Sequence, residues 1–241
     1  MKVPSQHGLK NPKESCVKTL KLLDLTHTLH ANIPFWDASC GFNIETTLDY
    51  GACTSIVKFR VQRINLMAAA GTHMDAPSHC IPSGASIAEI PLQQLEGPCF
   101  VVDVSDRASE SFSVEPDDIL QFETAYGKIS PGSWVLVRTG WESRWNNPEA
   151  YRNEYRFPSI SKEAAEILLQ RDVTGLGIDT LSPDRPQDGY PVHQLFLKNG
   201  KFIIENVAHS GDLPQTGARL LALPLKIAGG TESPLRLVGI L

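Results

Sequence analysis

The stretch Gly71–His79 (GTHMDAPSH) concentrates two of the chain's seven histidines and one carboxylate in a short segment. Alternate side chains of an extended backbone point the same way, so His73 and Asp75 would form a nitrogen and oxygen ligand pair on one face. Such a pair suits a hard or borderline divalent cation. Pro77 cannot donate to a sheet ladder, so His79 is expected where the chain turns, within reach of the same site. The alternative is an ordinary surface ion pair between His73 and Asp75.

Several elements must position this stretch. Strands are expected, in chain order, at 24–30, as one or two strands within 54–70, and at 99–104, 134–139, 173–178, 202–204, 220–227 and 235–241. Helices are expected to begin near Pro116 and to cover 162–171, with Ser161 as the N-cap. This mixture indicates an α/β or an α+β fold with one mixed β-sheet, and we predict the α/β class, with a central mixed β-sheet and flanking helices. We expect a polar N-terminal arm over 1–19 and one compact domain over 20–241.

The composition excludes several classes of protein. The chain has 241 residues, 41% of them hydrophobic and 20% charged, and a formal net charge of −5 with scattered basic residues. These values indicate a globular protein and argue against nucleic acid or an anionic membrane as a partner. No apolar run approaches the roughly 18 residues that cross a bilayer, and the polar start lacks a signal-type apolar segment. The expected location is therefore the cytoplasm.

Two further groups of side chains have an open interpretation. Phe35 and Trp36 follow a proline in a predicted loop and could form a substrate platform or cover the core. The five cysteines are an odd number without a Cys-x-x-Cys motif, which favours reduced thiols. Cys80 directly follows His79 and could line the same pocket, so a cysteine hydrolase is one alternative.

The stretch 71–79 resembles the H-x-G-T-H-x-D-x-P-x-H signature of the cyclase-like metal-dependent hydrolases, the family of bacterial kynurenine formamidase and isatin hydrolase. Further matches are spread over most of the chain. They lie at Asp24–Thr26, 91–103, 134–141, 177–182, and at His193 followed by Glu205–Asn206.

The resemblance implies a set of roles. His73, Asp75, His193 and Glu205 would bind one or two divalent ions, zinc or manganese, and His79 would be the catalytic acid/base. The implied fold is a compact α/β domain that assembles into homodimers or homotetramers. The implied reaction is arylformamidase-like: metal-activated water hydrolyses an amide, a cyclic amide or an ester of a small aromatic or cyclic molecule, with Phe35 and Trp36 lining the pocket.

One position departs from the signature. Ala69 stands where the first histidine is expected, and a methyl group cannot ligate a metal. The site would then hold one ion instead of two, or water or another group would fill the position, or activity would be lost. The competing function is accordingly a small-ligand-binding protein that has lost its chemistry.

Overall fold

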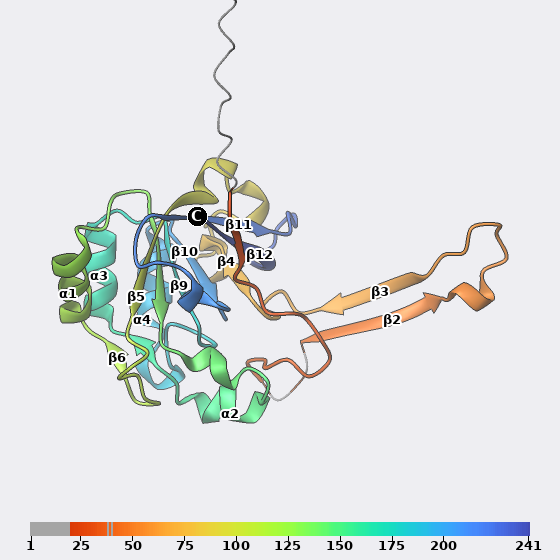
Figure 1. Cartoon of the computed structure of the whole chain (residues 1–241), viewed down its shortest axis with the longest axis horizontal. Coiled ribbons are helices and arrows are strands. Elements are labelled where there is room, and N and C mark those ends of the chain that lie inside the picture. The colour runs from red at the N-terminus through yellow and green to blue at the C-terminus, as the bar shows by residue number, and fades with distance from the viewer. Residues whose placement is uncertain (1–19, 38, 40) are drawn as a thin grey trace, which may run out of the picture.

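The computed structural model describes residues 20–37, 39 and 41–241. Its main sheet has the strand order β1-β12-β11-β5-β7-β9-β10-β4, and β12 also pairs with β4, so the sheet closes on itself as a barrel (Figure 1). The strands are β1 (Leu22–Asp24), β4 (His73–Asp75), β5 (Glu96–Asp103), β7 (Trp134–Arg138), β9 (Gly175–Ile178), β10 (Phe202–Glu205), β11 (Ala218–Pro224) and β12 (Glu232–Ile240).

Parallel and antiparallel pairs are both present. Strands β5, β7, β9 and β10 run parallel to one another, whereas β4, β11, β12 and β1 join through antiparallel pairs. The parallel strands are those whose sequences read as nearly continuous apolar runs, because both of their faces are covered. The predicted α/β fold with a mixed sheet is confirmed.

The two faces of the barrel wall bury different cores. Along β7, Trp134 and Leu136 point into the barrel interior, and Val135 and Val137 pack against the helices outside. Helices α1 (Pro116–Tyr126), α3 (Lys162–Gln170) and α4 (Pro191–Lys198) cover that outer side, and the short α2 (Pro148–Arg152) lies near its end (Figure 1). In the described part of the chain, no helix has the length and apolar character needed to span a bilayer.

Two small sheets complete the fold. Strands β6 (Ser113–Val114) and β8 (Ser159–Ile160) pair in parallel beside the helices. Strands β2 (Phe42–Leu48) and β3 (Val61–Leu66) form a two-stranded hairpin, here called the hairpin arm, which extends away from the body (Figure 1). Its base leads directly into the stretch that precedes β4.

Some sequence-based expectations need correction. The strand expected at 24–30 is wrong beyond its start, since β1 ends at Asp24 and Thr26 makes an isolated bridge to Val207. The ladder stops because the backbone N–H of His27 donates to the side chain of Thr72 at 3.0 Å instead of to a strand. The helix α4 was not expected from the sequence. The predicted arm over 1–19 lies outside the described residues, and the single domain and the cytoplasmic location stay predictions.

The close packing of β9 against β7 gives a test of the barrel wall. A Cβ at Gly175 would lie 2.5 Å from Cζ3 of the buried Trp134 and 2.7 Å from the carbonyl oxygen of Phe202. We expect Gly175→Ala to lower the free energy of unfolding by about 1–3 kcal/mol in urea titrations. A Cβ at Gly51 would meet nothing within 4 Å, so Gly51→Ala should change the free energy of unfolding by less than about 0.5 kcal/mol. Equal effects of the two variants would contradict this packing.

Candidate metal centre

Strand β4 sets the direction of the predicted ligands. Met74 points into the barrel interior, so His73 and Asp75 project from the outer face. In the antiparallel registers, Glu205 of β10 lies opposite His73, and Glu232 of β12 lies opposite Asp75. Residues directly opposite each other share a face of the sheet. Three neighbouring strands therefore bring one histidine and three carboxylates to the same side.

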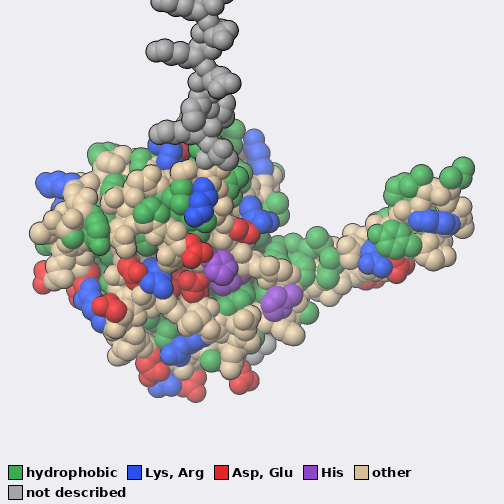
Figure 2. Space-filling view, viewed as in Figure 1, with side chains coloured by type: hydrophobic (Ala, Val, Ile, Leu, Met, Phe, Trp, Pro, Cys, Tyr) green, Lys and Arg blue, Asp and Glu red, His purple; other side chains and the backbone are tan. Residues whose placement is uncertain are grey.

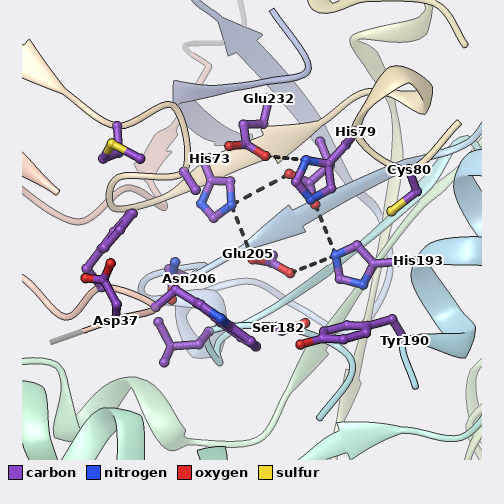
Figure 3. A pocket seen from close by; sticks show the side chains of 16 residues that line it. Asp37, His73, His79, Cys80, Ser182, Tyr190, His193, Glu205, Asn206 and Glu232 are labelled. Atoms are coloured by element: carbon purple, nitrogen blue, oxygen red, sulfur yellow. Dashed lines mark ion pairs between the residues drawn. The ribbon is translucent and has the colours of Figure 1, made fainter. Parts of the chain in front are cut away.

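Four of the predicted side chains form a closed ring (Figure 3). Nε2 of His73 lies 3.2 Å from Oε2 of Glu205 and 3.7 Å from Oδ1 of Asp75. Nε2 of His193 lies 3.3 Å from Oε1 of Glu205 and 3.4 Å from Oδ2 of Asp75. All four side chains are buried. Each imidazole thus faces both carboxylates.

This ring fits a divalent cation. Ligand atoms about 2.1 Å from a tetrahedral ion are separated by about 3.4 Å, close to the four distances across the ring. Within residues 20–37, 39 and 41–241, both carboxylate oxygens of Asp75 and Oε1 of Glu205 are buried without a hydrogen-bond partner. Buried acceptors that lack a donor and converge on one point form a site that a cation can fill. Two nitrogen and two carboxylate ligands suit zinc or manganese.

The tautomers of both histidines favour a ligand role. Nδ1 of His73 lies 2.9 Å from the carbonyl oxygen of Gly71 and can only donate to it, which leaves Nε2 unprotonated in the neutral ring. The same carbonyl accepts a hydrogen bond from Nδ2 of Asn206, whose Oδ1 lies 3.0 Å from the hydroxyl of Tyr151. This buried network fixes the orientation of the His73 ring.

Asp184 performs the same task for His193. Its Oδ2 lies 2.7 Å from Nδ1 of His193, so Nε2 faces the ring of ligands. The carboxylate also accepts hydrogen bonds from the backbone N–H groups of Val192 and His193, the start of α4, at 3.0 and 2.9 Å. Asp184 therefore caps the helix and at the same time orients the imidazole of His193. Sequence reasoning missed Asp184, although its position in the polar loop after β9 was a signal.

The charges of the ring depend on one another. Burial lowers the pKa of His73, but the hydrogen bond to Glu205 and the charges of Asp75 and Glu205 outweigh it and raise the pKa to about 9. Burial raises the pKa of Glu205, but His193 and His73 outweigh it and lower the pKa to about 2. Protons on the imidazoles thus balance the carboxylates in the metal-free protein. A cation would take over that balance and displace the protons.

His79 lies beside the ring, not in it. It ends the short 3-10 turn Pro77–His79 that follows β4, and its imidazole lies 5.9 Å from that of His193 between ring centroids. Its Nδ1 forms an ion pair with Glu232, and this contact raises the pKa of His79 against the opposing effect of burial. Sequence reasoning missed Glu232.

A cavity of about 500 Å³ opens over these groups. Phe35 and Trp36 line it, as does Tyr190, and the rings of Trp36 and Tyr190 lie 6.2 Å apart. Tyr190 has a left-handed backbone (φ 59°), which is uncommon for a bulky residue and often marks a functional position. It was not predicted. The pocket thus has an aromatic wall beside the polar groups, a composition typical of small-molecule sites.

The structure also places Ala69, Cys80 and His27. Ala69 lines the cavity from the turn before β4. Cys80 lines it too, but burial, partly offset by His193, raises the pKa of its thiol, which disfavours the thiolate of a cysteine hydrolase. His27 stacks on Trp145 at 3.8 Å, outside this cavity, and burial together with His209 lowers its pKa to about 3.

Comparison with known proteins decides the family. The family model for Cyclase matches residues 23–185. The chain belongs to the cyclase family. It is 33% identical to isatin hydrolase from Roseibium aggregatum over 70% of each chain. It is 30% identical to kynurenine formamidase from Maricaulis maris over 90% of this chain and 97% of that one. The resemblance noted in the sequence is confirmed.

Solved structures of the cyclase family agree with the fold. Isatin hydrolase A from Labrenzia aggregata, bound to benzyl benzoate, superposes with a TM-score of 0.83 at 33% identity, covering 92% of this chain and 94% of that chain. An isatin hydrolase bound to the product analogue thioisatinate gives 0.84 at 28% identity, covering 92% of both chains.

The coupled charges predict how pH affects stability. The raised pKa of His73 stabilises the metal-free fold fully below pH 6.5, and this contribution is lost as the pH rises through about 9. We expect the free energy of unfolding of chelator-treated protein to fall across this window, by up to about 1.4 kcal/mol per pH unit for one such histidine. Chemical denaturation at a series of pH values measures this fall in the free energy of unfolding. His73→Gln should flatten the slope, and an unchanged slope would contradict the assignment.

Proposed function

We propose that this cyclase-family protein is a metal-dependent hydrolase that cleaves an amide bond of a small aromatic or cyclic substrate. The observation that carries the proposal is the buried ring of His73, Asp75, His193 and Glu205. Among the described residues, three of its four carboxylate oxygens have no hydrogen-bond partner. The names of its relatives support the same class, since isatin hydrolase and kynurenine formamidase are both hydrolases.

These four side chains would hold the cation, zinc or manganese. Two groups of ligand atoms lie close enough to share an ion, one of His73, Asp75 and Glu205 and another of Asp75, His79 and His193. The first needs no further histidine, so one ion is compatible with Ala69. When bound, a divalent ion lowers the pKa of a coordinated water and polarises the carbonyl to be attacked.

His79 would move the protons of the reaction. With Nδ1 against Glu232, its Nε2 is the nitrogen left for substrate. It would take a proton from water as the new bond from oxygen to carbonyl carbon forms. It would then give that proton to the leaving nitrogen as the carbon–nitrogen bond breaks. The products are a carboxylic acid and an amine, in one molecule if the amide is cyclic.

The substrate class follows from the aromatic wall. Phe35, Trp36 and Tyr190 line the cavity together with the proposed ligands, and the ring of Tyr190 lies 6.1 Å from that of His193. A planar aromatic ring held there would orient its amide carbonyl toward His79 and the ligands. Isatin, a cyclic amide fused to a benzene ring, and aromatic formamides both fit this description.

The competing function is a small-ligand-binding protein, and Ala69 is the observation that favours it. Against it stand the paired tautomers of His73 and His193. Ligand binding alone would not need Gly71 and Asp184 to present both Nε2 atoms to the carboxylates of Asp75 and Glu205.

The proposal predicts chelator-sensitive turnover. Purified protein supplied with zinc or manganese should hold one or two ions per chain by elemental analysis and should hydrolyse isatin or an aromatic formamide. Removal of the ion with a chelator should abolish turnover, and reloading should restore it. Protein that cannot be loaded would overturn the hydrolase in favour of the binding protein.

Variants in the same assays separate the roles. His79→Ala should keep its metal but lose about 10²–10⁴-fold in kcat, whereas His73→Ala should lose both metal and activity. His209→Ala, an exposed histidine outside the cavity, is the matched control and should behave as the parent. Full turnover by His79→Ala, or stoichiometric metal in His73→Ala, would refute the corresponding role.

We also propose that the protein is a homo-oligomer joined through the hairpin arm. The arm carries exposed apolar side chains, some of them near its base and its tip (Figure 2). Ile44 and Ile64 are also exposed and lie directly opposite each other on β2 and β3. A two-stranded hairpin is marginally stable alone, and exposed apolar patches mark interaction sites. A symmetric pair of copies would bury both arms at once.

Sedimentation or light scattering tests this assembly. We would replace Ile44 and Ile64 together by Thr, a residue that also favours strands. In a two-fold dimer both copies carry the change, so each copy loses apolar surface at the interface. We expect the dissociation constant to rise by about 100-fold or more. Leu120→Gln changes an exposed residue of α1 and is the control, so it should leave the mass of the assembly in solution unchanged. A monomeric parent protein would contradict the proposal.

A further inference from the structure

Glu232 is a half-buried carboxylate that the ring of ligands does not use. It opens β12 and lies opposite Asp75 in the antiparallel register, so its side chain lies on the same face as the ligands and lines the cavity. Its side chain is 16% exposed. A carboxylate so placed beside Asp75 and Glu205 is unfavourable unless it has a positive or hydrogen-donating partner.

That partner is His79. Oε2 of Glu232 forms an ion pair with Nδ1 of His79 (Figure 3), and no other group among the residues that the structure describes donates a hydrogen bond to this oxygen. Neither group of side chains close enough to share an ion includes Glu232. The geometry therefore directs this carboxylate to the imidazole and not to a cation.

The backbone holds the two residues together. The N–H of Ala76, at the start of the turn that carries His79, donates to the carbonyl oxygen of Thr231 at 2.9 Å. Within that turn, the N–H of His79 donates to the carbonyl oxygen of Ala76 at 2.9 Å. Main-chain bonds thus place the imidazole at the end of a short turn beside the first residue of β12. The side chain of His79 is 35% exposed, so its ring needs a partner to hold one orientation.

We propose that Glu232 is a positioning residue: it holds Nδ1–H of His79, fixes the orientation of the ring, and leaves Nε2 directed to the substrate. The catalytic part of this proposal rests on the proposed function, with His79 as acid/base. A carboxylate in this place selects the tautomer whose Nε2 can accept a proton, and it stabilises the imidazolium that forms. An amide at the same position can turn its NH₂ toward Nδ1, which favours the opposite tautomer.

The test that needs no turnover is an NMR experiment on metal-free protein. With ¹⁵N-labelled histidine, the Nδ1–H proton of His79, identified by its absence in His79→Gln, should exchange slowly with solvent in the parent. It should exchange fast or vanish in Glu232→Gln. Unchanged exchange in Glu232→Gln overturns the proposal, whether or not the protein proves to be a hydrolase.

The kinetic test uses metal-loaded enzyme and the aromatic amide that it hydrolyses. Glu232→Gln should lower kcat by about 10²-fold or more, leave KM within a few-fold, and keep the metal content of the parent. Added to His79→Gln, the same change should cause little further loss, because both act through one group. Loss of metal in Glu232→Gln, or multiplicative losses in the double variant, would overturn the positioning role.

Glu142→Gln is the matched control. Glu142 is 17% exposed and lies 4.0 Å from His209, outside the cavity. The substitution therefore removes a carboxylate of similar exposure from another pair of a glutamate and a histidine. It should leave kcat unchanged. Glu232→Asp is the second variant if Glu232→Gln does not fold, and it should retain the slow Nδ1–H exchange in part. Fast exchange in Glu232→Asp would overturn the role.

Discussion

The register of β4 between β10 and β12 is the constraint on which the site depends. A three-residue strand carries little intrinsic preference, yet hydrogen bonds on both sides fix which of its residues face outward. Because side chains alternate along a strand, a slip by one residue would turn His73 and Asp75 into the apolar interior and Met74 to the pocket. The closure of the barrel through the β4–β12 pair is therefore what makes the site.

A second consequence of that register is a balance of buried charge. The pocket gathers several carboxylates with three imidazoles, and isolated buried charges are strongly unfavourable. Each imidazole is matched to carboxylates by short contacts, and the buried oxygens of Asp75 and Glu205 face the imidazole nitrogens. The fold thus tolerates the charges only as a set. Removing one partner leaves the others uncompensated, which is costly even where the pair itself adds little stability.

The sequence predicted the elements whose signals are local. The apolar runs of β5, β7 and β9 and the Ser161 cap of α3, whose Oγ accepts from the N–H of Ala164, could be read directly. The family motif also led to His73, Asp75, His193 and Glu205, which the fold brings together. The strand expected at 24–30 failed because a side chain, Thr72, takes the backbone bond.

The residues that were missed share a physical reason. Helix α4 is short and is capped by Asp184 from outside its own segment, so no local capping signal precedes it. Glu232 acquires its place through strand pairing with β4, which is distant in the sequence. Tyr190 is distinguished by its backbone conformation, which composition does not reveal. Side chains whose roles depend on long-range pairing or strain lie beyond a pattern-based prediction.

Tyr190 also sets a limit on how this protein can be stabilised. A glycine would adopt its left-handed backbone without steric cost, so such a replacement would relieve strain at the start of α4. The same replacement would remove the ring that lies 6.2 Å from Trp36 and 6.1 Å from His193. Thermal tolerance and the proposed recognition of aromatic molecules therefore make opposite demands on this position, and selection for one would erode the other.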